Sequence, residues 1–344
     1  MEETLSGPEA PFWREAINTE WEAMKKLQVW EEPPVPLPPG KTAVDGKFVF
    51  ARKEDEEGHV LRHRARFVGR GFTQTPGSDY TETFSSVVKW ATVRLVAALA
   101  AIFDWEIHVV DVKTAFLRAP LEEEVYLRQP PELSDGTGRV LRLNKALYGL
   151  KQSPRAWEKE LRKFLVSQGF KQSQTDQALY IKQVPGGILV VPVYVDDLMA
   201  TGTPPSAIKE FKDQLAAAYE IQDLGPISTY LGVQVVRDRK NKTLTLGLHK
   251  YIGALEQRFQ EQLNTPGIKG DRSPMVPETR KLLNKPKDEW TEEQLGGVPR
   301  KLYMSILGSL MYAAITCRPD LAYSVSFLSQ WGTDPRQLHL LALV

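Results

Sequence analysis

Residues 186–202 read GGILVVPVYVDDLMATG, an apolar run that ends in two adjacent aspartates and is followed by a second, shorter apolar run. This pattern predicts a β-hairpin with Asp196 and Asp197 at its tip. The first run, residues 188–195, is almost continuously apolar, so we expect both faces of its strand to be covered. Two carboxylates at the boundary between a buried sheet and solvent repel each other and resist desolvation unless something positive joins them. Taken alone, the segment would also suit a solvated Asp-Asp turn.

The bulk composition is that of an ordinary globular protein of 344 residues, of which 42% are hydrophobic and 25% charged. This length allows two or three subdomains with cores of their own. Because the formal net charge is only +1, nucleic-acid binding would have to come from local basic patches. The single cysteine, Cys317, excludes an intramolecular disulfide and a cysteine-rich zinc site, and it suits a reducing compartment.

The first thirty residues carry acids and tryptophans where a signal peptide needs an apolar block. No uninterrupted apolar run reaches the roughly 18 residues that a membrane span requires. We therefore expect an intracellular, cytoplasmic chain without a membrane partner.

Hydrophobic periodicity predicts both helices and strands. The expected helices cover residues 11–30, 91–103 (buried), 153–169 and 205–219, and helical patterns dominate after residue 250; the expected strands cover residues 47–50, 60–68, 105–112, 188–195, 198–200, 230–236 and 243–248. Prolines between residues 33 and 39 predict an extended linker, and the acidic loop 54–58 predicts a hairpin around it. Ser153 is expected as the N-cap of its helix, with Pro154 at the first helical position.

A second acid lies at the end of an apolar strand face. Residues 105–112 read WEIHVVDV, and Asp111 shares a face with three apolar side chains. If this strand neighbours the hairpin in one sheet, Asp111 converges with Asp196 and Asp197. Three carboxylates supply the oxygen ligands that Mg²⁺ prefers, and two such ions about 3.5 to 4 Å apart stabilise the attacking and leaving oxygens of a phosphoryl transfer.

Two other candidate sites fail on their sequence patterns. Gly40-Lys41-Thr42 is similar to the end of a phosphate-binding P-loop, but that motif needs a glycine where Val35 stands. His59 and His63 have a spacing that could hold zinc, yet no cysteine or HExxH pattern completes the set.

Several further blocks accompany the acids in a fixed order. They are residues 64–68 (RARFV) with 71–74 (GFTQ), Asp79-Tyr80 with Thr83-Phe84, residues 111–117 (DVKTAFL), 147–157 (LYGLKQSPRAW), 194–197 (YVDD), 230–233 (YLGV) and 316–320 (TCRPD). Each block is weak alone. Together, over residues 13–339, their order and spacing resemble copia-type retrotransposon reverse transcriptases.

This resemblance implies an α+β fold of the right-hand polymerase type, with fingers, palm and thumb and an antiparallel palm sheet. It implies an N-terminal helix and linker over residues 1–40, fingers and palm over 41–250, and a helical thumb or connection over 251–344 that stops before RNase H. The implied activity is RNA-directed DNA polymerisation with two Mg²⁺ ions, for which Mn²⁺ can substitute. Implied partners are an RNA and DNA template-primer, deoxynucleoside triphosphates, and the RNase H and integrase parts of a polyprotein, within a virus-like particle.

The resemblance also implies roles for single residues. Asp111 and Asp196 would hold both catalytic ions, assisted by Asp197, which points to the opposite face of the strand. The implied nucleotide contacts are Arg64 and Arg66 on the triphosphate, the backbone N–H groups of residues 112–115 around it, and Val112, Lys113, Ala115, Phe116, Tyr148, Lys151 and Gln152; the implied primer grip is Leu231, Gly232 and Val233.

Several of these residues also have a plain structural interpretation. Arg64 and Arg66, which share a strand face with Arg62, could be a solvated surface. Phe116 would exclude a ribose 2′-hydroxyl, or be a core aromatic, and the two roles are compatible. Gly149 would allow close backbone approach to the nucleotide.

The sequence departs from the family pattern in places. Pro192 interrupts the strand before the acids and removes a ladder donor, which predicts an edge strand or a bulge. Arg118-Ala119-Pro120 replaces an Asn-Gly-type turn, and Ser86 stands where family members often have proline. The chain also stops before the acids of an RNase H domain, so we expect one piece of a polyprotein or a truncated relic.

Two other functions stay open. A catalytically inactive nucleic-acid-binding remnant would bind template-primer in a salt-dependent manner through Arg62, Arg64, Arg66 and Arg70 without incorporating nucleotides. An unrelated metal-dependent phosphodiesterase would hydrolyse nucleic acid without nucleoside triphosphates.

Overall fold

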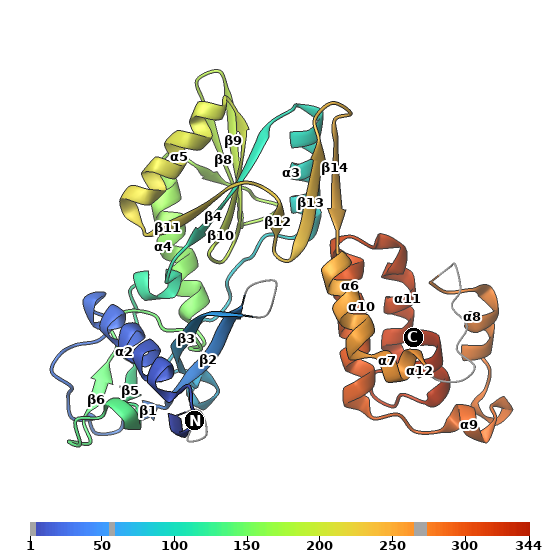
Figure 1. The fold of residues 1–344 in the computed structure, drawn as a ribbon, viewed down its shortest axis with the longest axis horizontal. Coiled ribbons are helices and arrows are strands. Elements are labelled where there is room, and N and C mark those ends of the chain that lie inside the picture. The colour runs from blue at the N-terminus through green and yellow to red at the C-terminus, as the bar shows by residue number, and fades with distance from the viewer. Residues whose placement is uncertain (1–4, 55–58, 265–273) are drawn as a thin grey trace. The chain divides into compact units, whose positions relative to one another are not determined.

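The computed structural model describes residues 5–54, 59–264 and 274–344, and the chain forms two compact units (Figure 1). Unit 1 consists of Met1–Val88 and His108–Gly225, and unit 2 of Lys89–Ile107 and Pro226–Val344. Helices and antiparallel strands occur in both, which confirms the α+β class. The division into residues 1–40, 41–250 and 251–344 stays a prediction about polymerase subdomains.

A six-stranded sheet lies at the centre of unit 1. Its strands are β11 (Ile221–Pro226), β4 (Glu106–Val112), β10 (Asp197–Thr203), β9 (Gly187–Tyr194), β8 (Leu179–Val184) and β7 (Lys171–Gln172), in this order across the sheet. β9 and β10 form the expected antiparallel hairpin, with Tyr194 opposite Asp197 and a two-residue turn between them. Residues 189–193 are all buried, as the continuous apolar run predicts.

Two amphipathic helices pack their apolar faces against this sheet and form a hydrophobic core with it. α4 (Ser153–Ser167) buries Trp157, Leu161 and Leu165, and α5 (Pro205–Ala218) buries Ile208, Phe211 and Leu215. These side chains join strand residues such as Val110, Val191 and Leu198 in one cluster. The spacing of three and four residues places each set on a single helix face.

A second core lies under the N-terminal helix α2 (Ala10–Lys26). It packs on the hairpin formed by β2 (Gly46–Glu54) and β3 (Val60–Gly69), where the rings of Trp21 and Phe67 lie 5.5 Å apart. The acidic loop expected at the tip of this hairpin lies outside the described residues between 55 and 58. β1 (Ala43–Val44), β5 (Tyr126–Arg128) and β6 (Val140–Arg142) form a small sheet beside the same core.

The structure corrects the interpretation of Pro192. β9 is an interior strand between β8 and β10, so Pro192 lies neither at an edge nor at a bulge. The register to β10 continues unshifted on both sides of it, but no pairs form opposite Met199 and Ala200. The missing N–H therefore removes ladder contacts locally without moving the strand.

The start of α4 is also different from the expectation. Gln152 is the N-cap and Ser153 is the first helical residue. The buried Ser153 hydroxyl donates to the Leu147 carbonyl (2.5 Å) and accepts from the Leu147 N–H (3.1 Å). It therefore closes the preceding loop and does not cap the helix.

Unit 2 combines a three-stranded sheet with helices. The sheet order is β12 (Thr229–Tyr230), β13 (Val233–Asp238) and β14 (Thr243–Gly247), so the strand expected over residues 230–236 is a hairpin. The helix expected to be buried, α3 (Trp90–Ile102), is only half buried, since Leu95 and Ile102 are exposed. The remaining helices are α6 (His249–Arg258), α7 (Gln260–Leu263), α8 (Pro277–Leu283), α9 (Glu292–Leu295), α10 (Arg300–Thr316), α11 (Ala322–Leu328) and α12 (Gln337–Leu343).

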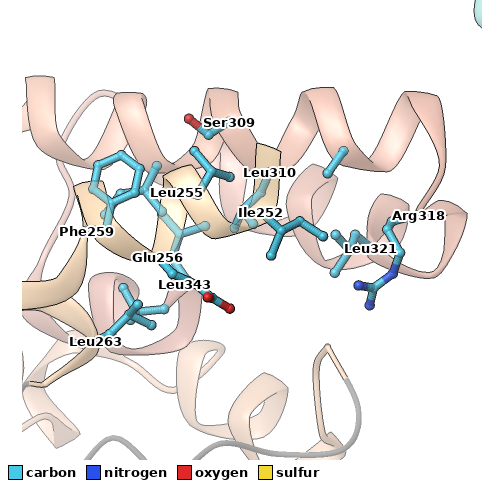
Figure 2. Close-up of a pocket in the computed structure, with 13 residues that line it drawn as sticks. Ile252, Leu255, Glu256, Phe259, Leu263, Ser309, Leu310, Arg318, Leu321 and Leu343 are labelled. Carbon is cyan, nitrogen blue, oxygen red and sulfur yellow. The ribbon is translucent and has the colours of Figure 1, made fainter. Parts of the chain in front are cut away.

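An apolar pocket of about 220 Å³ lies among α6, α7, α10 and the end of α12. Figure 2 shows the residues that line it. None of the site residues expected from the sequence lines it. Within the described residues, no helix combines the length and the apolarity needed to cross a membrane.

Candidate active site

The end of β4 is joined to the tip of the β9–β10 hairpin. The backbone N–H of Val112 donates to the Asp196 carbonyl over 2.9 Å, and β4 and β10 are neighbours in the sheet. Asp111, one residue before Val112, is thereby brought beside Asp196 and Asp197. The two strands are neighbours, as the expected convergence requires, and the role of the three acids as metal ligands stays a prediction.

The hairpin tip is held in a strained conformation. Val195 has a φ of 56°, which a β-branched residue rarely adopts. The indole N–H of the buried Trp157 donates to the Val195 carbonyl over 2.7 Å. This bond anchors the residue directly before Asp196, a role that helical periodicity could not assign to Trp157.

The three acids influence one another electrostatically. Burial, together with the negative charges of Asp196 and Asp111, raises the pKa of Asp197 to about 6. Burial likewise raises the pKa of Asp196, as does Asp111, while Arg66 and Arg64 oppose the rise. The acids therefore form a partly desolvated anionic cluster with two arginines nearby.

Residues predicted to contact the nucleotide gather around Tyr148. The Arg66 guanidinium lies 5.3 Å from the Tyr148 ring centroid, and the Phe116 ring meets Tyr148 edge-on at 4.8 Å. Burial raises the pKa of Tyr148, and so does the charge of Asp196. Arg64 and Arg66 on β3 thus lie in the same neighbourhood as the acids and the two rings.

Part of the expected phosphate cradle is already occupied. The Val112 N–H bonds to the hairpin tip, and the Lys113 N–H donates to the Glu220 carbonyl over 2.9 Å. The Lys113 ammonium also pairs with the Glu220 carboxylate at 3.0 Å. These two N–H groups are not open to a triphosphate, which leaves those of Thr114 and Ala115 for that role.

The side chain of Gln152, a predicted nucleotide contact, is engaged in hydrogen bonds within the protein. Gln152 is buried, its side-chain amide donates to the Asp79 carbonyl (2.8 Å), and its side-chain oxygen accepts from Gln74 (3.0 Å). Lys151 is exposed, and its backbone N–H donates to the Gln74 side chain over 2.8 Å. Only the Lys151 side chain is therefore available to a ligand.

Gly149 is explained by packing within the protein. Its φ is +87°, and a Cβ there would lie 2.1 Å from the Gly69 carbonyl oxygen. The close approach that requires glycine in this structure is to the end of β3. An approach of this backbone to a nucleotide stays a prediction.

The expected primer-grip residues belong to unit 2. Leu231 and Gly232 form the turn of the β12–β13 hairpin, with φ values of 49° and 80°. The Tyr312 hydroxyl donates to the Leu231 carbonyl over 2.8 Å, and Val233 is fully buried. The primer-grip role stays a prediction.

The acids fit a magnesium ion by their chemistry. Among the residues that the structure describes, no three acidic, histidine or cysteine side chains are gathered closely enough to hold a metal ion by themselves. Mg²⁺ usually keeps several waters and is bound by one or two carboxylates plus substrate phosphates, so a complete protein cage is not required. A cation would also offset the burial and the charge repulsion that together raise the pKa of Asp197.

Comparison with known proteins gives a consistent family. The family model described as reverse transcriptase (RNA-dependent DNA polymerase) matches residues 28–271. The chain is 36% identical over 342 residues to the retrovirus-related Pol polyprotein from transposon TNT 1-94 of Nicotiana tabacum, covering 98% of this chain and 25% of that protein. For the Pol polyprotein from transposon RE1 of Arabidopsis thaliana, the identity is 36% over 338 residues, with 96% and 22% covered.

A shorter relative matches over most of its own length. The putative transposon Ty5-1 protein of Saccharomyces cerevisiae is 32% identical over 233 residues, which are 67% of this chain and 71% of that protein. The chain spans about a quarter of the length of the two plant polyproteins.

Proposed function

Because the chain belongs to the reverse transcriptase family of copia-type transposon Pol polyproteins, we propose that it is an RNA-directed DNA polymerase that extends a primer on an RNA template. The observation that carries this proposal is the meeting of Asp111 with Asp196 and Asp197 beside Arg64 and Arg66. Phosphoryl transfer depends mainly on positioning and charge neutralisation, and this cluster supplies both.

In this proposal the sheet that carries the acids is the palm and the β2–β3 hairpin belongs to the fingers. The helices of unit 2 would supply the thumb or connection. The antiparallel pairing of β8, β9 and β10 supports the palm assignment, since such a sheet presents strand ends and hairpin turns at one edge.

The proposed chemistry assigns a task to each residue. Asp111 and Asp196, assisted by Asp197, would hold two Mg²⁺ ions, for which Mn²⁺ can substitute. Such ions stabilise the attacking 3′-hydroxyl oxygen and the leaving diphosphate oxygen. Their carboxylates must be ionised to do so, and a bound cation favours that ionised form.

The remaining residues would bind the incoming nucleotide. Arg64 and Arg66 neutralise the triphosphate, because guanidinium groups bind phosphate oxygens in pairs. The N–H groups of Thr114 and Ala115 donate to the same phosphates. Phe116 would lie beside the sugar and exclude a 2′-hydroxyl.

The partners follow from the same proposal. Template-primer and deoxynucleoside triphosphates are the substrates, and the RNase H and integrase parts of a polyprotein are further expected partners. Assembly into a virus-like particle stays a prediction.

Primer extension on an RNA template with Mg²⁺ tests the proposal. The double variant Asp196→Asn, Asp197→Asn should lower single-nucleotide incorporation by at least about a thousandfold. Asp213→Asn removes an exposed acid of α5 by the same substitution and should leave the rate unchanged. Undiminished synthesis by the double variant would refute the assignment.

The same assay separates the alternatives. An inactive remnant would bind template-primer, with affinity that falls steeply with salt, and incorporate nothing. A phosphodiesterase would shorten the nucleic acid in the absence of nucleoside triphosphates. No observation in the described residues favours either, because Pro192 is accommodated without a register shift next to the acids.

A further inference from the structure

Three buried polar residues form a hydrogen-bonded hub between two loops. Gln74, Asp79 and Gln152 are 6%, 2% and 2% exposed. The Gln74 amide donates to the Gln152 side-chain oxygen (3.0 Å), and the Gln152 amide donates to the Asp79 carbonyl (2.8 Å). We call these three residues the amide hub.

The amide hub is tied to the backbone on both sides. The Lys151 N–H donates to the Gln74 side-chain oxygen over 2.8 Å, and the Thr75 N–H donates to the Asp79 carboxylate over 2.7 Å. The Asp79 N–H returns to the Thr75 carbonyl over 2.9 Å. The side-chain oxygen and the side-chain amide of both Gln74 and Gln152 thus have hydrogen-bond partners, as buried polar groups require.

The amide hub reinforces direct backbone contacts between the same loops. The Gly69 N–H donates to the Tyr148 carbonyl (2.8 Å), and the Gly71 N–H donates to the Gly149 carbonyl (3.1 Å). A Cβ at Gly71 would lie 2.2 Å from the Gly149 oxygen, so the two backbones are in close contact. Residues 147–152 are therefore fixed to the end of β3, the strand that carries Arg64 and Arg66.

Tyr148 lies at the centre of this junction. Its carbonyl accepts a hydrogen bond from the Gly69 N–H, and its ring contacts both the Arg66 guanidinium at 5.3 Å and the Phe116 ring at 4.8 Å. A shift of residues 147–152 would move this ring relative to both neighbours. A displacement of about 1 Å in such a site can change rates by two orders of magnitude.

We propose that Gln74 and Gln152 are positioning residues that fix the Tyr148 ring and thereby set the affinity and sugar selectivity for the incoming nucleotide. This inference rests on the proposed polymerase function. It assigns Gln152 an internal role in place of the nucleotide contact expected from the sequence, and it assigns a role to Gln74, for which the sequence suggested none.

The variants Gln74→Leu and Gln152→Leu, alone and combined in the full chain, test this proposal. Each single variant should raise the KM for a deoxynucleoside triphosphate by about tenfold while changing kcat by less than about threefold. The combined variant should be little worse than the worse single variant, because both substitutions break one shared bond. Ribonucleotide incorporation relative to deoxynucleotide should rise in all three.

A purely structural role predicts a different result. Partial unfolding reduces the fraction of active enzyme and so lowers apparent kcat, but it leaves KM unchanged. The matched control is Gln172→Leu, which removes the side-chain amide that donates a hydrogen bond to the Gln177 carbonyl over 2.6 Å. Gln172 lies on the edge strand β7, which β8, β9 and β10 separate from β4. The KM of this variant should equal that of the wild type.

Hydrogen exchange supplies a readout that needs no activity. The backbone amides of residues 148–151 should exchange faster in Gln152→Leu than in the wild type. Their exchange rates in Gln172→Leu should equal those of the wild type. Unchanged exchange or an unchanged KM would overturn the positioning role. A wild-type chain that incorporates no nucleotide would refute the polymerase proposal, and hydrogen exchange would then decide the positioning of Tyr148 alone.

Discussion

The Val112 N–H donates to the Asp196 carbonyl over 2.9 Å and joins two segments that are far apart in the chain. Asp111 is the residue before Val112, the last residue of β4, and Asp197 begins β10. This bond, together with the pairing of β4 and β10 in the sheet, sets the spacing of the acids on which the proposed chemistry depends. Substitutions around this junction give specific expectations.

Trp157→Phe should lower kcat for nucleotide incorporation by roughly tenfold. The change removes the indole donor to the Val195 carbonyl, which restrains the strained residue before Asp196, and should destabilise the fold by about 1 kcal/mol. Single-turnover kinetics and chemical denaturation measure the two effects. Trp21→Phe, in the core under α2, should affect stability alone; equal kcat losses in both variants would contradict the anchoring role.

Phe116→Ala should raise ribonucleotide incorporation relative to deoxynucleotide by about tenfold or more. The ring packs against Tyr148, and its removal would open space beside the sugar. Competition between the two nucleotides on one template measures the ratio. Phe12→Ala truncates an exposed ring on α2 and serves as the control; unchanged discrimination in Phe116→Ala would remove that residue from the gate.

Gly149→Ala should destabilise the chain by roughly 3 kcal/mol or more. The new Cβ would meet the Gly69 carbonyl at 2.1 Å, in addition to the strain of a φ of +87°. Gly186→Ala, at φ +78° with open space around it, isolates the conformational part at about 1 to 2 kcal/mol. Urea denaturation compares them, and equal losses would show that close packing at Gly149 contributes nothing.

The stability of unit 2 should fall as the pH drops from about 6.5 towards 4. Burial lowers the pKa of His339 to about 4 in the folded chain, and its ring stacks on Trp331 at 4.6 Å and lies near Trp290. The folded state therefore favours neutral imidazole, whereas the unfolded chain takes up a proton near pH 6.5. The stabilisation is complete above the unfolded value and is lost as the pH falls through this window.

His339→Phe tests the assignment of this pH dependence. Denaturation of unit 2 at pH 7 and pH 5 should show a smaller difference in the variant, because the titrating ring is gone. The phenylalanine also loses the acceptor of the Arg336 N–H, so absolute stability is compared separately. An unchanged pH difference would assign the effect to other groups.

Much of the candidate site follows from sequence patterns alone. The run of residues 188–195 predicts a buried strand, and the two acids after it must mark its solvent edge. The alternation of Arg64 and Arg66 on β3 predicts a shared face, and both arginines lie near Asp196. Family resemblance added the expectation of nucleotide contacts at Phe116 and Tyr148, which are in ring contact.

Sequence patterns failed where the direction of a loop side chain mattered. Gln152 points inward because Gln74 and the Asp79 carbonyl receive it, and those partners lie far away in the chain. Ser153 has the identity of a cap, yet it bonds to Leu147. Local propensity cannot tell an inward-pointing side chain from an outward-pointing one, or a helix cap from a loop bond, since each alternative satisfies the hydrogen-bonding groups of the side chain.

The sequence by itself determined the hairpin of residues 186–202, its acidic tip and the family of the chain, because a run of apolar residues that ends in charge has few ways to be buried. Only the tertiary structure decided that β4 lies next to β10, that Pro192 can occupy an interior strand, and that Gly149 faces Gly69. These outcomes depend on hydrogen bonds and close contacts between distant segments, and such contacts are selected by the packing of the whole unit.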